Sequence, residues 1–136
     1  MTQLEALQAA LAGEHAALYG VGVAGGKLSG ARFKAATDAY GRHRDNRDHL
    51  SALVVAAGET PVAAEPAYDL PQAVTNAATA AALVLLIERR VAAVYGDLVE
   101  AAEQPAVRAF AIGSLLAAAR AQIAWGGAPV AFPGAV

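Results

Sequence analysis

The sequence contains no cysteine, which excludes disulfide bonds and thiolate metal sites. Charged residues are also scarce, at 16% of 136 residues against a usual share of about a quarter. With a net charge of −2, the chain lacks the basic face that nucleic-acid binding requires. Apolar residues make up 57% of the chain, a composition that excludes a disordered protein. We therefore expect one folded domain, residues 1–136, with no nucleic-acid partner.

No hydrophobic run is long enough to cross a bilayer. The longest extends from Ala77 to Ile87 and ends at Glu88-Arg89-Arg90, well short of the roughly 20 residues that a membrane span needs. Residues 1–5 lack the basic flank and apolar core of a signal peptide. These absences lead us to expect a cytoplasmic protein with no membrane partner.

Alanine, the strongest helix former, supplies more than a quarter of the residues. Apolar side chains recur at intervals of three and four, which predicts helices at about residues 2–25, 30–57, 71–102 and 105–126, followed by a non-helical tail, 127–136. The connection 59–70 contains two prolines and is longer than most links between helices. At ~3.3 Å per residue, it could run the ~40 Å length of the second helix. The sequence thus predicts an all-α, antiparallel four-helix bundle with a long crossover between helices two and three.

Several polar side chains interrupt the apolar stripes near the middle of the predicted helices. Glu14 lies on the first stripe, His43 and Arg47 on the second, and Glu88 on the third. Arg120 is the one charge in the second half of the fourth helix. We expect these five side chains to form a buried polar layer at mid-height. Because the two glutamates and two arginines balance in charge, the layer suits a structural network of ion pairs and hydrogen bonds.

The same residue types raise the alternative of a metal site. Carboxylate-bridged two-metal centres in bundles take a glutamate from each of two helices and a Glu-x-x-His pair from each of the other two. That pair is broken here, because Tyr40 and Asn46 stand three residues before His43 and His49. The fourth helix offers no Asp, Glu or His at all. The alternative is therefore a degenerate or mononuclear iron or manganese site of an oxidase or peroxide-consuming type. Its candidate ligands are Glu14, His43 and Glu88.

A further alternative is binding of a small anionic or apolar ligand between the helices, with polar contacts from Tyr40, His43 and Arg47. Nucleophilic catalysis has little support, because no serine has a recognisable neighbouring base. The stretches Gly20-Val21-Gly22 and Gly25-Gly26 lack the preceding strand and the following lysine-serine of a phosphate-binding loop.

The whole chain resembles a known family, the ferritin-like domain of unknown function found in actinobacteria. The stretches that carry the resemblance are residues 11–20 (LAGEHAALYG), 43–48 (HRDNRD), 68–71 (YDLP) and 131–134 (AFPG), together with Glu88. The resemblance implies a ferritin-like four-helix bundle and no established activity. The metal ligands of the wider superfamily carry over only to Glu14 and Glu88, with His43 as a third candidate, and the missing Glu-x-x-His motifs argue against oxidase or iron-storage function.

We therefore expect a non-catalytic ferritin-like bundle without a cofactor, which serves a structural role or binds another protein. The large apolar fraction also leads us to expect a homodimer, because apolar surface in excess of the core commonly marks an interface.

Overall fold

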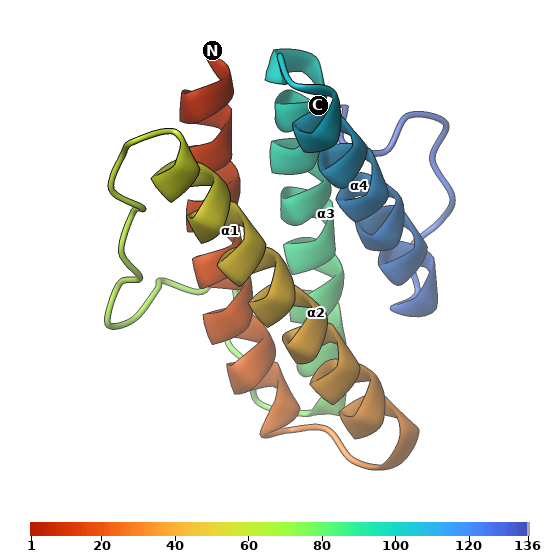
Figure 1. The fold of residues 1–136 in the computed structure, drawn as a ribbon. Helices are drawn as coiled ribbons and strands as arrows, with labels where there is room; N and C mark the ends of the chain where they lie inside the picture. The colour runs from red at the N-terminus through yellow and green to blue at the C-terminus, as the bar shows by residue number, and fades with distance from the viewer. Residues whose placement is uncertain (136) are drawn as a thin grey trace.

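The computed structural model describes residues 1–135, which form four α-helices and no strands. The helices are α1 (Gln3–Gly25), α2 (Gly30–Ala56), α3 (Ala77–Ala101) and α4 (Pro105–Ala124). They lie side by side as an open bundle (Figure 1). The prediction of an all-helical chain with four helices is confirmed.

The first two helices form an antiparallel hairpin whose ends follow from local chemistry. Thr2 caps α1, and Glu5 completes a capping box by accepting from the backbone N–H of Thr2 at 2.7 Å. Gly26 ends the helix. Gly30 then opens α2 with a φ of 57°, a left-handed value that favours glycine.

The connection between α2 and α3 runs along the outside of α1. Gln8, near the start of α1, bonds the backbone of Thr60 and Val62, both at 2.8 Å. Farther down the helix, His15 lies 3.0 Å from the carbonyl oxygen of Val62. Because the connection returns to the opposite end of the bundle before α3 begins, α2 and α3 run in the same direction (Figure 1).

Helix α3 begins at Ala77, six residues later than the start predicted at Pro71. The acid and proline at residues 69–71 do not start the helix. Asn76 does, because its side chain accepts from the backbone N–H of Thr79 at 2.9 Å, while the Thr79 hydroxyl accepts from the backbone N–H of Asn76. Residues 71–76 are instead part of the connection.

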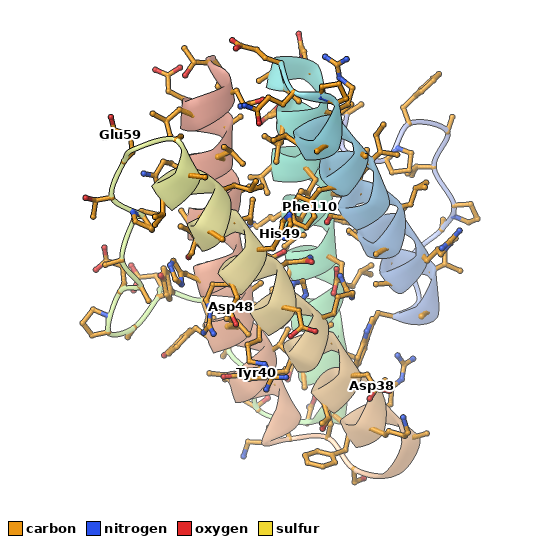
Figure 2. The ribbon with its side chains drawn as sticks, viewed as in Figure 1. Asp38, Tyr40, Asp48, His49, Glu59 and Phe110 are labelled. Atoms are coloured by element: carbon orange, nitrogen blue, oxygen red, sulfur yellow. The ribbon has the colours of Figure 1, made fainter. Side chains whose placement is uncertain are left out.

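The core is densest where α3 packs against α1 and α4, and where α1 packs against α2. Its largest fully buried apolar side chains are Tyr95, Leu7, Leu11, Leu50, Leu83 and Leu98. Helices α2 and α4 diverge (Figure 1). They touch where the rings of His49 and Phe110 pack with centres 4.2 Å apart (Figure 2), and where Arg32 Nη1 donates to the carbonyl oxygen of Ala124 at 3.1 Å. The bundle is therefore open along the α2–α4 side.

Helix α4 is rich in apolar residues, although most of them are not buried. By length and composition it could cross a membrane, and only 28% of its most apolar stretch is buried. Core helices of soluble proteins have the same composition, so this property alone assigns no environment. The core of this chain does not account for the exposed apolar residues of α4.

Candidate functional site

Three ionisable side chains from three different helices meet in the middle of the bundle. Glu14 comes from α1, His43 from α2 and Glu88 from α3, and the exposed fraction of each is 0%. All three were predicted to face inward from their positions on the apolar stripes. Buried charged groups are rare unless they are paired, so their contacts decide what the site can do.

His43 bridges the two glutamates. Its Nδ1 lies 2.5 Å from Oε2 of Glu14, and its Nε2 lies 2.9 Å from Oε1 of Glu88. A carboxylate can only accept hydrogen bonds, so each ring nitrogen must carry a hydrogen. With both glutamates ionised, this geometry fits the doubly protonated imidazolium form of His43.

Three further side chains add hydrogen bonds to the carboxylates. Glu14 Oε1 accepts from the Tyr95 hydroxyl at 2.6 Å and from Asn46 Nδ2 at 3.0 Å. Arg42 donates through Nη2 to Glu88 Oε1 at 2.6 Å. The two carboxylates are thus held by one imidazolium, one guanidinium, one phenol and one amide. Two negative and two positive charges meet here, so the buried cluster is electrically neutral.

The predicted arginine members of this layer were wrong. The Arg47 side chain is 33% exposed and pairs with its neighbour Asp48 at 2.8 Å. Its long stem carries the charge from the inward stripe to solvent. Arg120 is exposed because it lies two residues after the buried Ala118, which places it on the opposite face of α4.

Arg42, Asn46 and Tyr95 belong to the cluster, although the spacing of inward-facing residues did not predict them. Signals for two of them are present in the sequence: Tyr95 lies on the same inward stripe as Glu88, and Asn46 lies three residues after His43, on the same face of α2. Arg42 lies beside that stripe, and its side chain is 27% exposed. Its position gave no reason to choose it over Arg47.

The surroundings of His43 set its protonation. Burial would lower its pKa, but the hydrogen bonds and charges of Glu14 and Glu88 outweigh burial and raise the pKa to about 9. Burial and the charge of Glu14 also raise the pKa of the Tyr95 hydroxyl, so this group stays a neutral donor. His43 is therefore charged at neutral pH, in agreement with its two carboxylate contacts.

The cluster meets the open side of the bundle at a groove between α2 and α4. The groove is lined from α2 by Arg42 and Asn46, and from α4 by small side chains that include Gly113 and Ser114. Within the described residues, two buried atoms of the cluster have no hydrogen-bond partner: Nη1 of Arg42 and Oε2 of Glu88. Polar groups of this kind usually satisfy their bonding through water or a ligand.

The donor set does not fit a two-metal centre. A histidine ligates through a ring nitrogen with a free lone pair, whereas both ring nitrogens of His43 donate to carboxylates. The Arg42 guanidinium, which is permanently charged and cannot ligate, occupies one oxygen of Glu88. Across residues 1–135, no group of three or more His, Asp or Glu side chains is arranged to hold a metal ion.

Comparison with known proteins places this chain in a family. A family model described as a domain of unknown function, DUF4439, matches residues 6–136. No curated protein matches the chain. The crystal structure of a conserved hypothetical protein from Mycobacterium tuberculosis is similar, with 34% sequence identity and a TM-score of 0.88 over 90% of this chain and 93% of that one. The chain therefore belongs to the DUF4439 family.

Proposed function

We propose that this protein is a non-catalytic ferritin-like bundle in which the protonated His43 takes the place of a metal ion between two glutamates. The observation that carries the proposal is the bridge from Glu14 through both ring nitrogens of His43 to Glu88. A cation that is covalently part of the chain neutralises the carboxylates without a cofactor. The layer then holds three helices together, and function lies in contacts with other proteins.

The ferritin-like assignment rests on topology as well as on resemblance. Support comes from the long connection that leaves α2 and α3 parallel and from single glutamates in the middle of α1 and α3. Bundles with one long crossover and inward glutamates are the ferritin-like type. Asn46 stands where the Glu-x-x-His pattern would place a glutamate, and it donates to Glu14.

A mononuclear iron or manganese site on Glu14, His43 and Glu88 is the competing function. The unpartnered Oε2 of Glu88 favours it, because a carboxylate oxygen is a natural ligand for both metals. Such a site would require His43 to lose a proton and release a carboxylate, which acts against metal binding near neutral pH.

Elemental analysis after loading separates these functions. We expect purified protein incubated anaerobically with ferrous iron or Mn²⁺, then desalted, to retain far less than one metal per chain. The Glu88→Ala variant should retain the same background amount, as should Glu100→Ala, which changes an exposed glutamate of the same helix. Near-stoichiometric metal that disappears only in Glu88→Ala would contradict the proposal.

We also propose that the protein is a homodimer that pairs through α4. Support comes from Ile112, Leu116 and Ile123, which are 42%, 49% and 53% exposed and follow one helical stripe. Apolar stripes of this kind commonly mark an interface. Light scattering at micromolar concentration should give the dimer mass for the parent and the monomer mass for Leu116→Glu.

Val55→Glu is the matched control for this experiment, because Val55 is equally apolar and 61% exposed on α2. This variant should remain a dimer. A monomeric parent protein, or dissociation by both variants alike, would contradict pairing through α4.

A further inference from the structure

A second cavity lies between α1 and α3, beneath the connection that crosses from α2. Its volume is about 140 Å³, and it contains no side chain of the buried polar cluster. The segment Tyr68–Pro71 passes over it and forms one wall. The cavity is thus a separate feature of the fold, bordered by two helices and a strap of irregular chain and open to solvent on one side.

The cavity exists because α1 presents its smallest side chains to α3. Gly13, Ala16, Ala17 and Gly20 line the α1 wall. A Cβ added at Gly20 would lie 2.5 Å from Cδ1 of Ile87 on the facing wall, and one added at Gly13 would lie 3.2 Å from Cγ2 of Val94. Both glycines therefore permit the close approach of α3, and the small side chains of Ala16 and Ala17 leave the space beside them unfilled. The α3 wall is aliphatic, so the interior is apolar.

The strap over the cavity is fixed by contacts at both of its edges. The Tyr68 ring packs against Tyr19 with ring centres 5.7 Å apart, and its hydroxyl accepts from the Glu65 backbone N–H at 2.9 Å. Leu70 packs against the hydrophobic core. Because the strap is anchored in this way, the cavity is preformed in the absence of a ligand, which lowers the entropic cost of binding.

The mouth of the cavity carries two charges, Arg90 and Asp69. Arg90 is exposed and makes no hydrogen bond or ion pair within the described part of the chain. A guanidinium binds carboxylates through paired hydrogen bonds. Asp69 repels a second negative charge at the same mouth, which selects a ligand with a single carboxylate.

We propose that this cavity binds a small monocarboxylate with an aromatic or branched aliphatic body, which enters the apolar interior while its carboxylate contacts Arg90. The volume matches the body of such a ligand, because an apolar cavity of about 150 Å³ accommodates benzene. This binding is independent of the charge state of His43 and of pairing through α4.

Benzoate is the probe, and benzyl alcohol is its uncharged partner of the same size. We expect benzoate to shift the backbone amide signals of Gly13 and Gly20 saturably in a two-dimensional NMR titration of the full chain. Benzyl alcohol should bind at least tenfold more weakly, because it lacks the charge that Arg90 recognises.

Three variants locate the contact. Arg90→Gln should weaken benzoate binding at least tenfold, whereas Arg89→Gln, the neighbouring exposed arginine that does not line the cavity, should leave it unchanged. Ala16→Leu should abolish binding by filling the interior. Because Arg90 is on the surface, its variant tests the proposal even if Ala16→Leu fails to fold. Absence of saturable shifts, equal binding of the alcohol, or equal loss in both arginine variants would overturn the proposal.

Discussion

The Glu88→Ala variant is expected to unfold with a free energy lower than that of the parent by about 3–5 kcal/mol. The substitution removes the carboxylate that receives hydrogen bonds from both His43 and Arg42. It leaves two cations near a single remaining carboxylate, in a cluster with little access to water. Breaking a buried ion pair by deleting one partner costs more than the pair itself contributes, because the other charge stays buried.

Urea denaturation followed by circular dichroism measures this difference. An equal dependence of the free energy of unfolding on urea concentration in variant and parent would show that both unfold in the same way. Glu100→Ala is the control on the same helix, since Glu100 is exposed and its loss should change stability by no more than about 0.5 kcal/mol. Equal stability of Glu88→Ala and the parent would show that the carboxylate does not hold the cluster together.

Raising the pH from 6.5 to 9 is expected to lower the free energy of unfolding by about 3 kcal/mol through His43 alone. Its pKa is about 9 in the folded protein and about 6.5 in an unfolded chain. Between these values the native state holds a proton that the unfolded state has released, so stability falls as pH rises. Below pH 6.5 both states are protonated and the contribution is fully present; above pH 9 it is lost.

Urea titrations at several pH values within this window test the effect. The fall should disappear in His43→Gln, which cannot titrate, and should persist in His49→Gln, which changes an exposed histidine of the same helix. A parent protein whose stability is flat across the window, or a fall that survives in His43→Gln, would contradict the charged state of His43.

The sequence predicted the three central residues because each interrupts an otherwise apolar stripe in the middle of its helix. Glu14, His43 and Glu88 are all fully buried in the structure. Periodicity places a Cα on a face of a helix, but it does not say where a long side chain ends. Arg47 starts from the inward stripe and reaches solvent, whereas Arg42 starts beside the stripe and reaches Glu88.

The start of α3 shows a second limit of pattern reasoning. Asp69 and Pro71 are good helix-starting residues, yet the capping pair Asn76 and Thr79 prevails. Residues 71–76, which were predicted to be helical, belong instead to the connection. From this connection, Leu70 and Val74 pack against the hydrophobic core. The separation of α2 from α4 also lies beyond periodicity, because it depends on how all four helices pack together.

The protonation of His43 can be observed directly by NMR of protein labelled with ¹⁵N at its histidines, with the His43 signals assigned by their absence in His43→Gln. At pH 7.5, a bridging imidazolium has hydrogens on both ring nitrogens, so both should give N–H signals protected from exchange with water. A single protonated nitrogen at this pH would mean that His43 is neutral and that Glu14 and Glu88 are not held by an internal cation.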